Sequence, residues 1–212
     1  MSMKYDDDFR KTKCIGITGG VGAGKSAVLD YLREKTLCRI FYSDDEAKKL
    51  YDPQNAVFQR IKEAAGEDIL KSDGSLDKKR FAARLFEDND LRERINSIVH
   101  PAMESMILDN MALERSEGKR DFFFVEAALL VECGYDRILD ELWYVYASEE
   151  TRRKRLKDTR GYSDEKIRGI FDSQISEKEY REHCARVIDN DGSMQAMHAS
   201  VDKILKEVSN KR

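Results

Sequence analysis

Eight residues near the N-terminus, Gly-Gly-Val-Gly-Ala-Gly-Lys-Ser at positions 19–26, could bind a nucleoside triphosphate. They fit the pattern G-x-x-x-x-G-K-[S/T] of a phosphate-binding loop. A triphosphate concentrates several negative charges, so its site needs inward-facing backbone N–H groups and no side chains in the way. The four glycines leave that backbone bare. Lys25 could then reach the β- and γ-phosphates, and the Ser26 hydroxyl could ligate Mg²⁺.

A glycine-rich turn between a strand and a helix would share part of this pattern. Here an apolar run at 14–17 precedes the loop and a helical pattern follows it, which is the context that a phosphate-binding loop requires. The helix would point its N-terminal dipole and amides at the phosphates. We therefore expect the nucleotide to contact Gly20, Val21, Gly22, Ala23, Gly24, Lys25 and Ser26.

A second group suited to phosphate chemistry is the basic segment 152–160, in which six of nine residues are Arg or Lys. Such charge runs are usually solvated helix faces. Phosphoryl transfer, however, relies on charge stabilisation, so the γ-phosphate needs cations from a second side. A basic helix followed by a turn suits a lid that closes over a nucleotide. Arg155 and Arg160 are the candidates, and spacing does not decide which one reaches in.

Two adjacent carboxylates, Asp44 and Asp45, could accept the proton of an acceptor hydroxyl. They could also order a water on Mg²⁺. Together with Ser43 they could instead cap a helix that starts near Glu46, because Ser and Asp are good N-cap residues. The sequence leaves these alternatives open.

Two further residues, Glu126 and His100, could have either a functional or a purely structural role, and the sequence favours neither. Glu126, at a predicted strand end, could order the water around magnesium or be an ordinary strand-end carboxylate. His100, before Pro101, could bind a substrate phosphate or mark a helix start, since proline favours the first turn of a helix.

The hydrophobic pattern indicates which elements position these residues. A strand, a helix and a strand over residues 14–42 form a βαβ unit with parallel strands, so the fold class is α/β. Ligands bind at the carboxyl ends of such strands. Further strands are predicted at 122–125, 142–147 and 186–189.

Residues 54–117 look all-helical and are too long for a simple crossover. We expect a helical insert that supplies one wall of a substrate cleft, with a helix break at His100-Pro101. The single chain 1–212 would then have a nucleotide-binding core at 14–53 and 118–212, with a lid region at 149–183.

Composition narrows the class of protein. Lys and Arg number 38 against 41 Asp and Glu, which argues against general nucleic-acid binding. The four cysteines lie far apart without C-x-x-C, which favours a reducing cytoplasm. The three histidines show no zinc spacing. We read residues 1–13 as a frayed polar leader, with no signal peptide or membrane span, and a monomer is favoured.

Several separated motifs resemble the dephospho-CoA kinase family over roughly residues 14–192. Residues 15–26 look like the family's G-L-T-G-G-I-G-S-G-K-S start. In the middle of the chain, the family's D-G-x-L-D-R turn is similar to Asp-Gly-Ser-Leu-Asp-Lys at 73–78, and its helix-ending H-P matches Ile-Val-His-Pro at 98–101. The family's P-L-L-F-E looks like Ala-Leu-Leu-Val-Glu at 128–132, where Ala128 replaces the proline. Towards the C-terminus, a glutamine after the lid matches Gln174, and V-I-D-N-N-G looks like Val-Ile-Asp-Asn-Asp-Gly at 187–192.

The resemblance implies transfer of the ATP γ-phosphate to the ribose 3′-hydroxyl of dephospho-CoA, giving CoA and ADP in the last step of coenzyme A biosynthesis. It implies a Rossmann-like P-loop kinase fold with a helical CoA-binding insert and a lid. The cofactors would be ATP and Mg²⁺, with dephospho-CoA as small-molecule partner. On the matched motifs, Asn190 would contact the nucleotide, whereas Asp44, Lys78 and His100 would contact the substrate.

This sequence departs from the family at the expected base. The family has D-A-D after the second strand, and its first Asp is taken as the base. One alignment places Tyr42 at that first Asp and Asp44 at the second, and a shift by one residue places Ser43 and Asp45 there. The first carboxylate is missing either way. Arg155 and Arg160 also lie one residue further apart than the family pattern.

Other functions fit the sequence less well. A kinase for another small hydroxyl compound is disfavoured by the H-P motif and the long insert. A GTPase-type switch would need N-K-x-D, which does not occur. A degenerate loop that only binds is disfavoured because Lys25 and Ser26 are intact.

Overall fold

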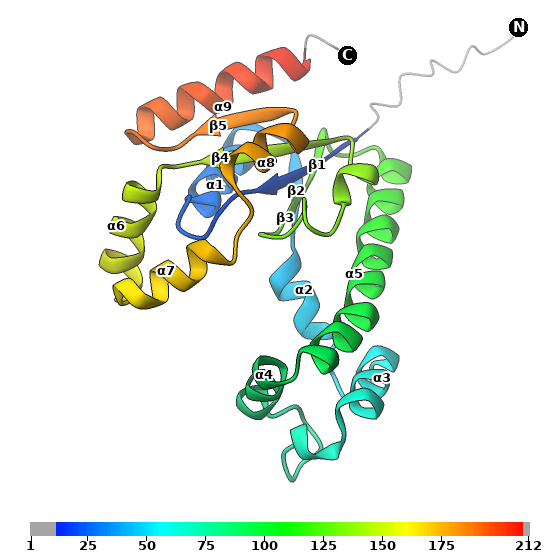
Figure 1. Cartoon of the computed structure of the whole chain (residues 1–212). Helices are drawn as coiled ribbons and strands as arrows, with labels where there is room; N and C mark the ends of the chain where they lie inside the picture. The colour runs from blue at the N-terminus through cyan, green and yellow to red at the C-terminus, as the bar shows by residue number, and fades with distance from the viewer. Residues whose placement is uncertain (1–11, 210–212) are drawn as a thin grey trace, which may run out of the picture. The chain divides into compact units, whose positions relative to one another are not determined.

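The computed structural model describes residues 12–209, which divide into two units (Figure 1). The first contains residues 12–41 and 111–209, and the second contains Tyr42–Asn110. Each unit is described by itself below.

The first unit contains a parallel sheet. Within residues 12–209, five strands pair in the order β2-β3-β1-β4-β5, and the pairs β1–β3, β1–β4 and β4–β5 are each parallel. The continuous apolar run of β3 is fully buried apart from its last residue, Glu126, as expected for a strand covered on both faces. The predicted α/β class is confirmed. The strands are β1 (Lys13–Thr18), β2 (Cys38–Tyr42), β3 (Phe122–Glu126), β4 (Glu141–Tyr146) and β5 (Arg186–Asp189).

The register brings the carboxyl ends of four strands to one edge. Ile17 pairs with Glu126, Thr18 with Tyr144, and Tyr146 with Asp189. The segments that follow these strands therefore start side by side, although they are far apart in the sequence. This is the edge at which parallel α/β sheets bind ligands.

Helices cover the sheet and extend from its edge (Figure 1). Helix α9 (Met194–Ser209) packs against β5 and α1 (Lys25–Lys35), while α8 (Glu177–His183) packs against β4. Serines cap the three helices after β4, because Ser148, Ser163 and Ser176 accept hydrogen bonds from amides in the first turns of α6 (Glu149–Arg160), α7 (Asp164–Asp172) and α8. The Ser148 cap fixes where the basic helix α6 begins, and Gly161, in the left-handed conformation, ends it.

Part of the predicted leader is ordered. Residues 1–11 lie outside the described residues, but Thr12 is 1% exposed and Lys13 already belongs to β1. The Thr12 hydroxyl donates a hydrogen bond to the Arg120 carbonyl oxygen at 2.7 Å. The prediction that residues 12 and 13 are frayed is therefore wrong, since side-chain bonding and strand pairing hold them.

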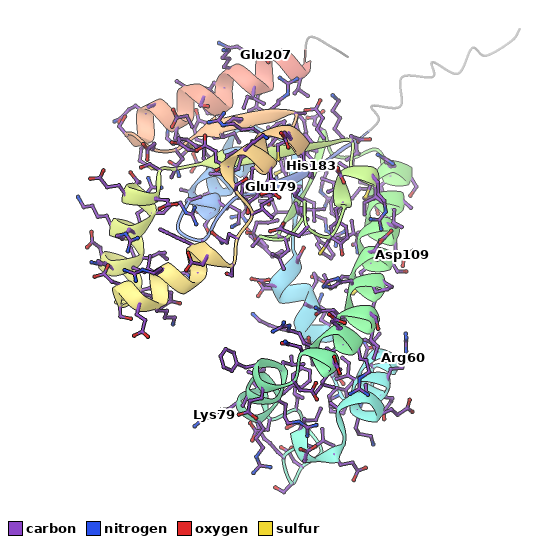
Figure 2. All side chains as sticks on the ribbon, viewed as in Figure 1. Arg60, Lys79, Asp109, Glu179, His183 and Glu207 are labelled. Carbon is purple, nitrogen blue, oxygen red and sulfur yellow. The ribbon has the colours of Figure 1, made fainter. Side chains whose placement is uncertain are left out.

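The second unit is built around a helical core. Phe58, Ile61, Ile69, Leu91 and Ile95 are almost completely buried in one cluster, whereas Arg60 on α3 and Lys79 on α4 are exposed and project outward (Figure 2). The apolar period of the sequence thus corresponds to one buried face per helix. The elements are α2 (Ser43–Lys49), α3 (Ala56–Ala65), η1 (Glu67–Ile69), α4 (Lys78–Glu87) and the first part of α5 (Asn89–Glu117).

Two helix starts differ from the sequence-based prediction. Helix α5 runs through Pro101, where a break was predicted. Pro101 has no backbone N–H to donate to the Ser97 carbonyl oxygen, so one helical hydrogen bond is lost. The burial of Ile98 and Met103, on either side of Pro101, offsets that loss. Helix α2 begins directly at Ser43 with Tyr42 as its N-cap. The predicted cap by Ser43, Asp44 and Asp45 is therefore wrong, because β2 leads into the helix without a connecting loop.

Replacing Phe58 with alanine is expected to lower the free energy of unfolding by about 3–5 kcal/mol, because it leaves a cavity in the core of the second unit. Phe58 is 1% exposed, and Phe86, on α4 of the same unit, is 85% exposed. The matched change Phe86→Ala should alter stability by no more than about 0.5 kcal/mol. Urea denaturation followed by circular dichroism measures both, and equal effects would contradict the described core.

Among residues 12–209, no helix combines the length and the apolar character needed to cross a lipid bilayer.

Candidate functional site

The glycines of the loop at 19–26 are required by close backbone approaches. Gly19 has φ 142°, and a Cβ atom there would lie 2.5 Å from the Val145 carbonyl oxygen of β4. Gly24 has φ 89°, and a Cβ atom there would collide with the side-chain amide of Asn190. A left-handed φ strains residues that carry a side chain. The neighbouring residues therefore leave no room for side chains at Gly19 and Gly24, in agreement with the bare backbone that the sequence predicts.

The N-terminus of α1 is suited to an anion. Within the described part of the chain, no side chain caps α1 at Gly24, and its first turn carries no acidic residue. The first amides of a helix lack intrahelical partners and carry the positive end of the dipole. A phosphate group at this position would accept hydrogen bonds from these amides and would be attracted by the positive end of the helix dipole.

Lys25 reaches back over the loop from the first position of α1. Its Nζ donates a hydrogen bond to the Gly19 carbonyl oxygen at 2.9 Å and lies 3.6 Å from Oε1 of Glu126. The two side chains are only 13% and 17% exposed. Glu126 thus holds the ammonium group beside the start of the loop, where it can meet the end of a phosphate chain. Ser26, the next residue, is exposed in the same helical turn.

Arg155 binds the loop from the basic helix α6. One of its terminal nitrogens donates to the Ala23 carbonyl oxygen at 3.2 Å, and the other donates to the Asn190 carbonyl oxygen at 2.8 Å. Asn190 is 4% exposed, and its side-chain amide donates to the same Ala23 oxygen at 2.7 Å. The loop, α6 and the turn after β5 are therefore joined at Ala23.

Asp191 fixes the start of the basic helix. Its Oδ1 accepts hydrogen bonds from the backbone N–H and the hydroxyl of Ser148, at 2.8 and 2.7 Å. Hydrogen bonds from Thr151 and Ser148 hold the pKa of the Asp191 carboxyl below its usual value. The turn after β5 therefore positions α6 as well as the loop.

The two lid arginines predicted from the sequence lie in different surroundings. Arg155 contacts the loop, as described above. Arg160, at the end of α6, is exposed, and its guanidinium carbon lies 6.0 Å from the centre of the Tyr162 ring.

Arg152 is a residue that the sequence-based reasoning missed. Its Nε donates to the Val21 carbonyl oxygen of the loop at 3.0 Å. The guanidinium group also hydrogen-bonds Gln174 and lies 4.3 Å from the centre of the Phe171 ring. Burial lowers the pKa of Arg152. Its spacing could have identified it, because a residue three positions before Arg155 lies on the same face of a helix.

The predicted acceptor residues all belong to the second unit. Asp44 is exposed in the first turn of α2, and the neighbouring Asp45 pairs with Lys48 at 2.6 Å. His100 is exposed within α5. Lys78, the first residue of α4, lines a groove of about 460 Å³ whose other lining residues are Lys48, Lys49, Tyr51, Asp52, Lys71, Ser75 and Leu76.

A magnesium ion would depend on the nucleotide for most of its ligands. Residues 12–209 contain no group of three or more His, Cys, Asp or Glu side chains that could hold a metal ion. Mg²⁺ is commonly bound through one or two protein groups together with substrate phosphates and water. The exposed Ser26 hydroxyl beside the N-terminus of α1 fits that arrangement.

Comparison with known proteins gives consistent similarities. A family model described as dephospho-CoA kinase matches residues 13–196. The chain is 32% identical to a dephospho-CoA kinase of Corynebacterium glutamicum, over 92% of this chain and 98% of that protein. It is 34% identical to the dephospho-CoA kinase of Symbiobacterium thermophilum, over 90% of this chain and 79% of that protein. The solved structure of the dephospho-CoA kinase of Campylobacter jejuni has the same fold, with a TM-score of 0.69 and 22% sequence identity. The match covers 93% of this chain and 98% of that one.

Proposed function

The chain belongs to the dephospho-CoA kinase family, and we propose that its loop and Arg155 hold ATP while the γ-phosphate is transferred to the ribose 3′-hydroxyl of dephospho-CoA, giving CoA and ADP. The observation that carries this proposal is the convergence of Lys25, Arg155 and Asn190 on the carbonyl groups of one glycine-rich loop. Such a site offers amides and cations to a phosphate chain from two sides.

The donor half of the reaction depends on charge. The amides of the loop and of α1 would bind the phosphates, and Lys25 would stabilise the charge that develops during transfer. Arg155 would act from the side of α6. Ser26 would hold Mg²⁺ together with phosphate oxygens and water, and the ion would neutralise phosphate charge. Glu126 keeps Lys25 in position through the contact described above.

The acceptor half would use the second unit. We propose that residues 54–117 bind dephospho-CoA and that 149–183 form the lid. The groove beside Lys78 supports this, because Lys48, Lys49 and Lys71 also line it. The ammonium groups of Lys48 and Lys49 pair with Asp45 and Glu46 at 2.6 Å, so Lys71 and Lys78 are the candidates for binding the diphosphate of dephospho-CoA. His100 is a further candidate contact for a substrate phosphate.

The protein would act in the cytoplasm as a monomer. It would take small-molecule substrates rather than nucleic acid, since its charges nearly balance, with 38 basic against 41 acidic residues.

The decisive experiment is an ADP-release assay with ATP, Mg²⁺ and a panel of small hydroxyl compounds. Dephospho-CoA is expected to give turnover far above that with water, with CoA as product. If dephospho-CoA gives no more ADP than water while a nucleoside or a sugar does, the proposed acceptor is wrong.

Asp44→Asn is expected to lower kcat far more than Asp45→Asn, because Asp44 would accept the proton of the 3′-hydroxyl. Asp45 already pairs with Lys48 at 2.6 Å. Steady-state kinetics of the two variants, which differ by one position in the same helix, measure the difference. Equal and mild effects would show that neither carboxylate is the base and that alignment of the substrates carries the rate.

A further inference from the structure

The side chain of Arg152, on α6, lies against the phosphate-binding loop and has no role in the site proposed above. A Cβ atom at Gly20 would be 2.5 Å from its guanidinium carbon, so the group lies directly on the loop backbone. Its Nε also donates a hydrogen bond to the Val21 carbonyl oxygen at 3.0 Å. Glycine at position 20 therefore makes room for a positive charge near the start of the loop.

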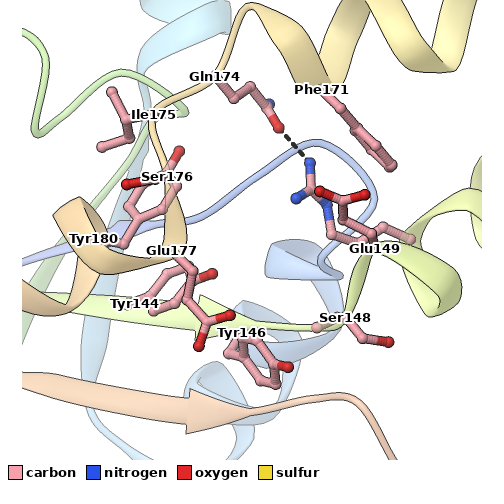
Figure 3. A pocket seen from close by; sticks show the side chains of 12 residues that line it. Tyr144, Tyr146, Ser148, Glu149, Phe171, Gln174, Ile175, Ser176, Glu177 and Tyr180 are labelled. Carbon is pink, nitrogen blue, oxygen red and sulfur yellow. Dashed lines mark hydrogen bonds between the residues drawn. The ribbon is translucent and has the colours of Figure 1, made fainter.

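α7 and the residues that follow it hold this guanidinium group from another side. One terminal nitrogen donates a hydrogen bond to the Gln174 side chain, drawn as a dashed line in Figure 3. The centre of the Phe171 ring lies 4.3 Å from the guanidinium carbon. An aromatic face attracts a cation without neutralising it. Arg152 also lines a cavity of about 220 Å³ (Figure 3), and part of its side chain remains exposed.

The partners of the Arg152 guanidinium group leave its charge uncompensated. Among the described residues, its hydrogen bonds go to the Val21 carbonyl and the Gln174 side chain, and both of these groups are neutral. Its neighbour Arg153 instead pairs with Asp164 at 3.2 Å. A guanidinium group has more N–H donors than these two bonds use. A partly buried cation with spare donors is suited to an anion that arrives with a substrate.

The position of Arg152 along the loop indicates which anion this would be. Lys25, which would meet the β- and γ-phosphates, binds the carbonyl oxygen of Gly19 at 2.9 Å. Arg152 lies against the glycine that follows, so the two cations are at the same end of the loop. Arg155 binds the loop further along, at the Ala23 carbonyl oxygen. The phosphate group nearest to Arg152 would therefore be the one that is transferred.

We propose that Arg152 contacts the γ-phosphate of ATP and stabilises the negative charge on its oxygens during transfer. This inference rests on the proposed function, because it names a further catalytic residue of the same ATP site. The acceptor oxygen forms a bond to the γ-phosphorus, and its proton passes to a base. The bond from that phosphorus to the bridging oxygen breaks, and ADP leaves with the electron pair. Arg152 keeps its protons throughout and supplies charge only.

Binding of two nucleotides that differ in the γ-phosphate tests this contact. Arg152→Met removes the charge and keeps a side chain that can pack on Phe171. With Mg²⁺ present, its affinity for the non-hydrolysable analogue β,γ-imido-ATP is expected to fall by about tenfold or more, because a charge-assisted hydrogen bond is lost. Its affinity for ADP should stay within about twofold of the wild-type value, since ADP has no γ-phosphate. Isothermal titration calorimetry measures both affinities.

Arg153→Met is the matched control for this variant. Arg153 is the next residue on α6 and lies 5.4 Å from the centre of the same Phe171 ring, but it pairs with Asp164 of α7 and not with the loop. It should change neither affinity. In steady-state kinetics at saturating ATP, Arg152→Met should lower kcat by at least about a hundredfold. Arg152→Lys, which keeps the charge but not the fork, should restore part of that loss.

A purely structural role for Arg152 would give a different result. If it only holds α6 and α7 against the loop, Arg152→Met weakens both nucleotides equally, and that result would overturn the assignment. Unchanged affinities together with a near-normal kcat would overturn it as well. Thermal melting verifies folding, and Arg152→Lys provides the same comparison of the two nucleotides if the methionine variant does not fold.

Failure of the proposed acceptor would be seen separately, because nucleotide binding needs no acceptor. If the wild-type chain binds β,γ-imido-ATP but does not phosphorylate dephospho-CoA, the acceptor assignment is wrong and calorimetry still decides the role of Arg152. If the wild-type chain binds neither nucleotide, the ATP site and the role of Arg152 are both wrong.

Discussion

Lys25→Ala is expected to reduce kcat for ADP release with dephospho-CoA by at least about a hundredfold, because removing one preorganised charge donor from a transition state costs that much or more. The Gly19 carbonyl oxygen at 2.9 Å and Glu126 at 3.6 Å help to place Lys25 for this role. Its ammonium group is held in place before any nucleotide binds, so no ordering cost arises at the moment of reaction.

The variant also leaves Glu126 largely buried beside an empty position, so stability must be measured together with activity. A melting temperature close to that of the wild-type chain would assign the loss to chemistry. Lys35→Ala is the matched control, because Lys35 is exposed at the other end of α1. It should leave kcat unchanged. Near-normal turnover by Lys25→Ala would contradict the assignment of the loop.

The donor half of the site could be predicted from the sequence because its chemistry is local. Gly19, Gly24, Lys25 and Ser26 lie within one strand–loop–helix segment, and their spacing follows from the backbone that a phosphate requires. The strand ends could also be placed, since parallel strands bring their carboxyl ends to one edge. Glu126 reaches Lys25 for that reason, because Ile17 pairs with Glu126 in the sheet.

The parts that the sequence did not reveal depend on contacts between distant segments. Arg152 binds Val21, which lies 131 positions away, and Asn190 binds Ala23, which lies 167 positions away. Spacing along α6 could place Arg152 on the face of Arg155, but it could not identify what that face touches. The interruption predicted at Pro101 was wrong for a similar reason, since buried residues on both sides hold α5 together.

The acceptor residues were identified from motifs that lie apart in the sequence. Asp44, Lys78 and His100 come from three such motifs, and all three belong to the second unit. Motif spacing could identify these residues, but it could not show that Lys48, Lys49 and Lys71 line the groove beside Lys78, because they come from different segments of the chain.

Arg155→Ala is expected to lower kcat/KM for ATP by roughly a hundredfold, because it removes a charged fork aimed at the loop. The contacts with Ala23 at 3.2 Å and Asn190 at 2.8 Å place this guanidinium group at the loop already. Arg160→Ala should have a much smaller effect, since Arg160 is exposed beside Tyr162. Steady-state kinetics with varied ATP measure both variants.

Arg153→Ala serves as the control for changing a charge on α6, because Arg153 pairs with the exposed Asp164 at 3.2 Å. Arg155→Lys separates charge from geometry, since lysine keeps the charge but cannot bind Ala23 and Asn190 with one fork. Partial recovery by lysine would show that charge at the phosphates matters, and no recovery would show that the fork itself orders the loop. A larger loss in Arg160→Ala than in Arg155→Ala would overturn this assignment and identify Arg160 as the residue that the closing lid brings to the phosphate.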